Sequence, residues 1–261
     1  MKLQFVQDQV DGAVVELVNN IREEDLKRAI TAIRGATQHS LSLQDMRFAQ
    51  ALAQVDHVQQ LVDNPNMLLG RMDTKHGELA EQVEVAIQNS KSLLHGMGII
   101  ATADPEVVGR TRNAPTDYII NGIHVQSKFI NSESNTLTHV LEHLEKYEKI
   151  GFGRDDRSFY HIPKDQYKNI ITMLKKGEFE GRKLSSIEAI RAKVSEIERI
   201  SGRKFEDVVR PAHVKYGEVQ WGRIDGTLEK IRFNIEEENE QLIKKIEADS
   251  KKEQMDTPFL V

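Results

Sequence analysis

Three residues beside a predicted turn have the side chains and spacing for metal-assisted phosphodiester hydrolysis. Asp117 comes shortly before an Asn-Gly pair, and Gln126 and Lys128 follow it. Strand alternation places Gln126 and Lys128 on one face, and Asp117 on the partner strand can meet that face. A carboxylate, an amide oxygen and an ammonium at one point are suited to bind Mg²⁺ and offset charge on a scissile phosphate.

These residues depend on a hairpin and on a helix that precedes it. Asn121-Gly122 between β-branched residues predicts two antiparallel strands, at about 117–120 and 123–130. Apolar residues at helical spacing predict a helix that starts near Lys75 and ends at Gly96. The sequence therefore predicts a change from helix to sheet ahead of the candidate site.

The run DYIINGIHVQSKF, residues 117–129, resembles the PD-(D/E)XK nuclease superfamily in the Gln-x-Lys form of the Mrr-type restriction endonucleases. Those enzymes carry an acidic residue on the helix before the first core strand. Glu81 is similar in position, and Glu84 is the substitute. Residues 163–167 resemble the P-x-x-x-Y helix of bacterial relatives of this fold. The resemblance covers about residues 75–178, with 216–228 as a candidate extension, and it does not cover the N-terminal helices.

The resemblance implies an α/β fold with a restriction-endonuclease-like core, a mixed sheet flanked by helices, and helical additions at both ends. It implies that Glu81, Asp117 and Gln126 bind Mg²⁺ or Mn²⁺, and that Lys128 serves the water and the phosphate. DNA is the expected substrate ahead of RNA, in restriction, phage defence or toxin action. The chain departs from the majority pattern because Pro115 does not directly precede Asp117, and because neutral Gln126 stands where an acid is usual.

The distribution of charge supports a polyanionic partner although the whole chain has a net charge of −5. Residues 146–215 hold 17 Lys and Arg against 11 Asp and Glu. Local patches govern binding to a phosphate backbone more than net charge does. The residues expected to contact nucleic acid are Lys164, Lys168, Lys175, Lys176, Arg182 and Lys183. The alternative on charge alone is a set of solvated helices that display lysine.

Composition excludes several other classes of protein. The absence of cysteine excludes a disulfide framework, a thiolate metal site and a cysteine nucleophile. No apolar stretch approaches the ~20 residues that span a membrane, and the first residues do not resemble a signal peptide. We therefore expect a cytoplasmic protein with no membrane partner.

Two other functions compete with the nuclease hypothesis. His139, Glu142 and His143 match the H-x-x-E-H pattern of inverted zinc peptidases, with Glu218 as the expected third ligand. The other alternative is a non-catalytic nucleic-acid-binding or helical interaction protein that keeps only a nuclease-like core. The neutral side chain of Gln126 favours this alternative.

The predicted domains are a helical module at 1–70, the α/β core with the basic segment at 71–215, and a long helix with a tail at 216–261. In the first module, Gly35 is expected to end one helix and Ser42 to begin the next, which stops at Asn64-Pro65-Asn66. The other expected elements are helices at 136–149, 163–176, 187–200 and 224–252 and a strand at 158–162. The last helix is charged, with sparse apolar positions, and predicts a homodimer or a partner complex.

Overall fold

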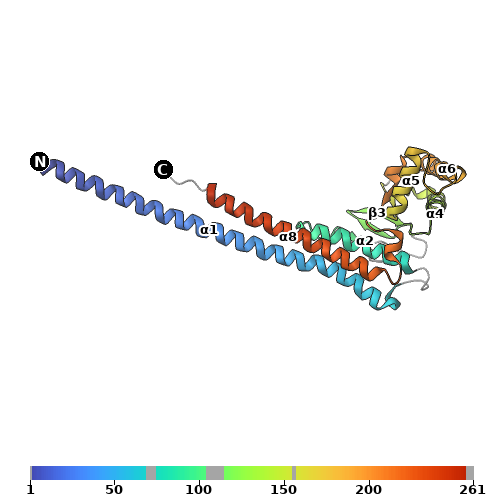
Figure 1. Cartoon of the computed structure of the whole chain (residues 1–261), viewed down its shortest axis with the longest axis horizontal. Helices are drawn as coiled ribbons and strands as arrows, with labels where there is room; N and C mark the ends of the chain where they lie inside the picture. The colour runs from blue at the N-terminus through green and yellow to red at the C-terminus, as the bar shows by residue number, and fades with distance from the viewer. Residues whose placement is uncertain (1, 69–74, 104–114, 155–156, 257–261) are drawn as a thin grey trace. The chain divides into compact units, whose positions relative to one another are not determined.

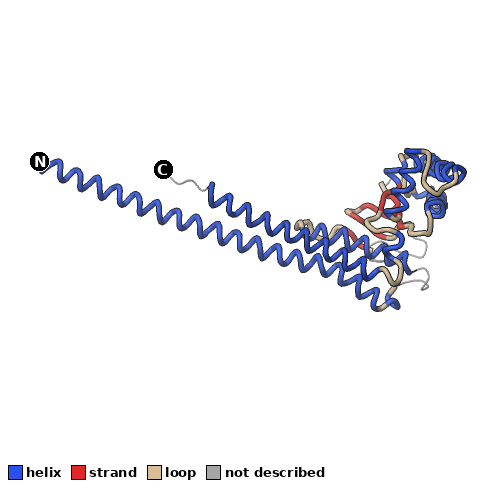
Figure 2. The backbone as a smooth tube through the Cα atoms, in the orientation of Figure 1, coloured by secondary structure: helices blue, strands red, loops and turns tan. Residues whose placement is uncertain are grey.

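The computed structural model describes residues 2–68, 75–103, 115–154 and 157–256. It is an α/β structure with one five-stranded mixed sheet and mostly helical content (Figures 1 and 2). The helices are α1 (Lys2–Asp63), α2 (Lys75–Leu94), α4 (Glu133–Lys146), α5 (Lys164–Lys176), α6 (Leu184–Ser201), α7 (Phe205–Val208) and α8 (Ile224–Asp256). The strands are β1 (Ala101–Thr102), β2 (Tyr118–Ile120), β3 (Ile123–Ser127), β4 (Phe159–Ile162) and β5 (Val209–Pro211). Short 3₁₀ helices are η1 (Pro65–Met67), η2 (Glu148–Ile150) and η3 (Tyr216–Val219).

The chain divides into two compact units. One unit combines residues 1–47 with 236–261, and the other contains residues 48–235. The domain limits expected near residues 70 and 215 stay predictions. Within the described ranges, no helix has the length and apolar character needed to cross a membrane.

In the first unit, the N-terminal part of α1 and the C-terminal part of α8 run antiparallel. Thr37 Oγ1 donates to Ser250 Oγ at 2.6 Å, and Gln44 Nε2 donates to Asn239 Oδ1 at 2.8 Å. The expectation of a helix end at Gly35 is wrong, because α1 is continuous from Lys2 to Asp63. A helical glycine costs only about 1 kcal/mol, and the polar contacts with α8 lie just beyond it. The predicted end at Asn64-Pro65 is confirmed.

The sheet of the second unit has the strand order β1-β2-β3-β4-β5. The first three strands form an antiparallel meander, and β4 and β5 add in parallel to β3. The predicted hairpin is confirmed. Asn121 and Gly122 both have positive φ, of 50° and 75°, as a two-residue type I′ turn requires. The second strand ends at Ser127, three residues earlier than expected.

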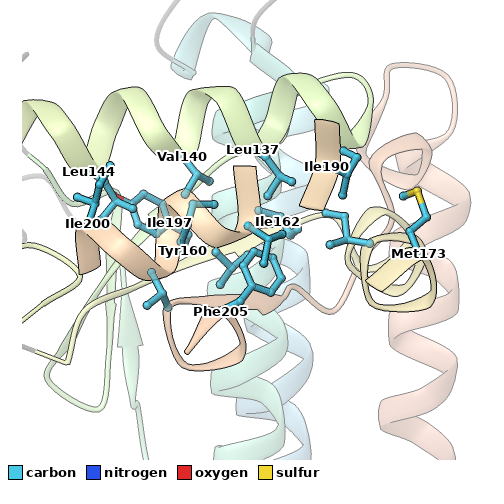
Figure 3. Close-up of a cluster of buried hydrophobic side chains, with 14 of the residues drawn as sticks. Leu137, Val140, Leu144, Tyr160, Ile162, Met173, Ile190, Ile197, Ile200 and Phe205 are labelled. Atoms are coloured by element: carbon cyan, nitrogen blue, oxygen red, sulfur yellow. The ribbon is translucent and has the colours of Figure 1, made fainter. Parts of the chain in front are cut away.

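The two faces of the sheet support two hydrophobic clusters. Tyr118, Val125 and Phe159 pack with Val85 of α2 on one face. On the other face, Tyr160 and Ile162 pack against apolar side chains of α4, α5 and α6 (Figure 3). Strand alternation explains the division, because neighbours in β4 point to opposite faces. The sheet is thus covered by helices on both faces.

Candidate active site

Asp117 immediately precedes β2, where the hairpin brings it opposite the end of β3. Its backbone N–H donates to the carbonyl of Val125 at 2.9 Å. Its carboxylate oxygen Oδ2 accepts hydrogen bonds from the side-chain amide of Gln126 and from the backbone N–H of Ser127, the latter at 2.8 Å. Gln126 is buried, with 6% of its surface exposed. The structure therefore places the predicted carboxylate and amide in direct contact.

Lys128 follows β3 and is half-buried beside these groups. Its backbone N–H donates to the carbonyl of His161 at 2.9 Å, which extends the pairing of β3 with β4. Burial lowers the pKa of the Lys128 ammonium, and the negative charges of Asp117 and Glu81 act in the opposite direction. The ammonium is therefore within electrostatic reach of both predicted acidic residues.

Glu81 lies on α2 and is 7% exposed. Its charge acts on Lys128 and on the buried phenol of Tyr118, which directly follows Asp117. Burial raises the pKa of Tyr118 well above its usual value, and the carboxylates of Glu84, Glu81 and Asp117 raise it further. The charge of Glu81 therefore acts on Lys128 and Tyr118, the same two groups on which the charge of Asp117 acts.

Glu84, the substitute candidate, has different partners. Its carboxylate is 1% exposed and accepts hydrogen bonds from the backbone N–H of His213 at 2.8 Å and from Nδ1 of the same residue at 2.7 Å. Nδ1 of His161 lies 3.8 Å from it. Burial pushes the pKa of Glu84 up, but the bonds from His213 and the nearby His161 lower it to about 2. Glu84 is therefore a buried anion held by His213.

His161 links this pair to the hairpin. Its Nδ1 lies 2.6 Å from the hydroxyl of Tyr118. Burial lowers the pKa of His161 to about 4, so the ring is neutral near pH 7 even though Glu84 opposes this shift. Sequence reasoning did not find His213, because 129 positions separate it from Glu84 and no local pattern connects them.

The donor set at Asp117 fits a hard divalent cation. Glu81 and Asp117 carry carboxylate oxygens and Gln126 carries an amide oxygen, which are the ligand types that Mg²⁺ accepts. The Gln126 amide presents its nitrogen to Asp117, so its oxygen would reach a cation bound there only after the amide group turns over. Mg²⁺ binds through one or two carboxylates and keeps water or phosphate oxygens in its other positions. Two carboxylates would therefore suffice for Mg²⁺. Among the described residues, no group of three or more His, Asp or Glu side chains is arranged to hold a metal ion.

Five of the six residues expected to contact nucleic acid are exposed lysines. Lys168, Lys175 and Lys176 lie on α5 around a surface hollow of about 360 Å³ that Tyr167 and Ile171 also line. Lys164 begins α5, and Lys183 directly precedes α6. Arg182 differs, because its guanidinium donates to Glu133 Oε2 at 2.6 Å.

The predicted zinc ligands have separate surroundings. His143 is buried, its Nδ1 lies 2.8 Å from the hydroxyl of Tyr160, and its ring packs edge-on against Phe152. Burial lowers the pKa of His143 to about 3, and the positive charges of Lys128 and Lys146 add to this. His139 is exposed, with Nδ1 3.4 Å from Glu142 Oε2. Over the residues that the structure describes, these side chains do not form a metal-binding group with a third ligand.

Comparison of the chain with protein-family models, with curated proteins and with solved structures found no match.

Proposed function

We propose that this chain is a metal-dependent endonuclease that hydrolyses phosphodiester bonds, with DNA as its preferred substrate. One observation carries the proposal. The hairpin joins Asp117 to Gln126, and the charges of Asp117 and Glu81 both reach the Lys128 ammonium. A carboxylate bonded to an amide, and a cation on which that carboxylate and a second one both act, form a set that metal-assisted phosphodiester hydrolysis uses.

The arrangement of the elements supports a restriction-endonuclease-like core. A helix that carries Glu81 precedes a meander. Asp117 directly precedes β2 of that meander, and the Gln-x-Lys sequence runs from the end of the neighbouring strand β3 to the residue after it. Helices cover both faces of the mixed sheet. These are the features that the sequence resemblance requires of the fold.

Each residue has a distinct role in the proposed reaction. Glu81, Asp117 and Gln126 would hold Mg²⁺ or Mn²⁺, which when bound polarises the phosphate and supports ionisation of water. Lys128 offsets the charge that develops on the phosphate oxygens. The hydrogen bond from the Ser127 N–H fixes the Asp117 carboxylate at the end of the hairpin.

The proposal also covers how the chain binds DNA and the biological process in which it acts. The exposed lysines at 164, 168, 175, 176 and 183 would contact the phosphate backbone, while Arg182 is already paired with Glu133. A homodimer or a partner complex through α8 is part of the proposal, and two copies of the chain would suit cleavage of both strands. A cytoplasmic role in phage defence, restriction or toxin action accords with the resemblance.

A plasmid-nicking assay tests the proposal. Supercoiled DNA is incubated with the wild-type chain in Mg²⁺, in Mn²⁺ and in EDTA, and we expect nicking only with metal. Asp117→Ala should abolish nicking, whereas Asp249→Ala, at an exposed position of α8, should leave it unchanged. Wild-type protein that binds DNA but does not cut it with either metal would favour the non-catalytic alternative. One tightly bound zinc per chain would favour the peptidase.

A further inference from the structure

The buried carboxylate of Glu84 fixes the orientation of the imidazole ring of His213, which lies just after the carboxyl end of β5. Glu84 holds His213 by two hydrogen bonds, one from the backbone N–H and one from Nδ1. Because Glu84 is charged, Nδ1 is the donor, and Nε2 remains as the ring nitrogen that can meet a substrate. The side chain of His213 is 35% exposed, so the ring is both oriented and accessible.

The topology places His213 on the same edge of the sheet as the candidate metal site. Strands β3, β4 and β5 are parallel, so the segments that follow them leave the sheet at one edge. Lys128 follows β3, Lys164 comes two residues after β4, and His213 comes two residues after β5. In α/β sheets with parallel strands, ligands bind outside the carboxyl ends of those strands.

Helix α2 supports both the candidate metal site and His213. Glu81 and Glu84 lie three residues apart on α2 and therefore on neighbouring positions of one helical face. Glu81 acts on Lys128, and Glu84 holds His213. The carboxylates of both residues act on Tyr118, which directly follows Asp117.

We infer that His213 is a further catalytic residue of the proposed nuclease, the general acid that protonates the leaving oxygen, and that Glu84 is its positioning residue. In this step, water adds to phosphorus and loses a proton to solvent. The bond from phosphorus to the leaving oxygen breaks, and that oxygen takes the proton from Nε2 of His213. Solvent then returns a proton to Nε2. The inference rests on the proposed function, since it assigns one proton transfer within that reaction.

Charged and titratable groups face His213 from three elements of the structure. Glu84 of α2 contributes a negative charge, and His161 of β4 lies on the other side of that carboxylate. The first turn of α5 adjoins the same segment through Lys164 and Asp165, whose backbone N–H and carboxylate bond to residues 214 and 216. The carboxylate of Glu84 is thus the fixed, buried counter-ion of His213, as in the carboxylate–histidine pair of a catalytic triad.

The test replaces His213 by Asn, whose side-chain N–H stands in for Nδ1 and keeps a donor for Glu84 but removes Nε2. The substrate is a duplex oligonucleotide cut at a mapped position, together with the same duplex carrying sulfur in place of the leaving oxygen. A thiolate leaves without a proton. We expect His213→Asn to slow cleavage of the ordinary duplex about 10²–10⁴-fold, and cleavage of the sulfur duplex less than about 10-fold.

Three control variants separate the outcomes. Asp117→Ala should stop cleavage of both duplexes, His57→Asn at an exposed position of α1 should change neither, and Glu84→Gln should repeat the His213→Asn pattern more weakly. Equal losses on both duplexes at an unchanged unfolding temperature would overturn the acid role, as would wild-type rates on both. If wild-type protein cuts neither duplex with Mg²⁺ or Mn²⁺, the proposed function fails and this inference fails with it.

Discussion

The side-chain amide of Gln126 donates a hydrogen bond to the carboxylate of Asp117 across the base of the hairpin. The two residues are therefore in direct contact, and the side-chain partner of the Asp117 carboxylate is a neutral amide rather than a second acid. A neutral ligand at this position avoids like-charge repulsion but binds a divalent cation less strongly than a carboxylate.

Gln126→Glu should therefore make the fold depend on metal. In EDTA, two adjacent carboxylates repel, and a loss of about 1 kcal/mol would lower the unfolding temperature by about 2–4 °C. Mg²⁺ should raise the unfolding temperature of this variant more than that of the wild type. Gln88→Glu is the matched control, because Gln88 Nε2 donates to the Glu84 carboxylate at 3.0 Å. An equal Mg²⁺ response in both variants would contradict a metal site at Asp117.

Lys128→Ala should lower metal-dependent cleavage by at least ~10²-fold, the loss typical of one missing contact to transition-state charge. The ammonium is half-buried, and its removal leaves the carboxylates of Asp117 and Glu81 without this cation. Lys91→Ala, at an exposed position of α2, should retain wild-type cleavage. Rates are measured on plasmid at saturating Mg²⁺, with circular dichroism as the check on folding. Near-normal cleavage by the Lys128 variant would remove this residue from the mechanism.

The parts of the site that could be predicted from sequence are those set by local geometry. Asn121-Gly122 needs positive φ at both positions, so the turn, the strand pairing and the meeting of Asp117 with Gln126 follow from neighbouring residues. The contact of Glu84 with His213 joins α2 to the segment after β5 and depends on the whole fold. No nearby residue indicates it.

Two features of the fold lack a local signal in the sequence: the strand β5 and the continuity of helix α1 through Gly35. The strand β5 has only three residues and ends in Pro211, so no alternation is long enough to indicate it. A proline is acceptable there because β5 is an edge strand of the sheet. Helix α1 passes through Gly35, since its antiparallel contacts with α8 come from a segment about 200 residues away.

His143 should make the fold less stable in acid. The unfolded chain binds a proton on this ring as pH falls below 6.5, whereas the folded chain resists protonation until about pH 3. The free energy of unfolding should therefore decrease across this window, by at most about 1.4 kcal/mol per pH unit from this residue. His143→Phe should reduce that slope in denaturant titrations from pH 6.5 to 4. His139→Phe, on the exposed side of the same helix, serves as control, and equal slopes in all three proteins would refute the assignment.

The lysines at the end of α5 should contribute to binding of duplex DNA. Each neutralised phosphate releases counterions and adds about 0.9 to the log–log dependence of affinity on salt. Lys175→Ala with Lys176→Ala should therefore weaken binding evenly across sequences and reduce the slope by up to ~2. Fluorescence anisotropy at several salt concentrations measures both quantities.

A structural role for the same two lysines gives a different result. They occupy the last turn of α5, just before Gly177, where positive charge also complements the helix dipole. In that case the double variant loses a few tenths of a kcal/mol of stability while the salt slope stays unchanged. Lys251→Ala with Lys252→Ala on α8 is the matched control, because it removes two consecutive exposed lysines from the other unit of the chain. If both double variants reduce the slope equally, the effect reflects net charge, and α5 is not the binding surface.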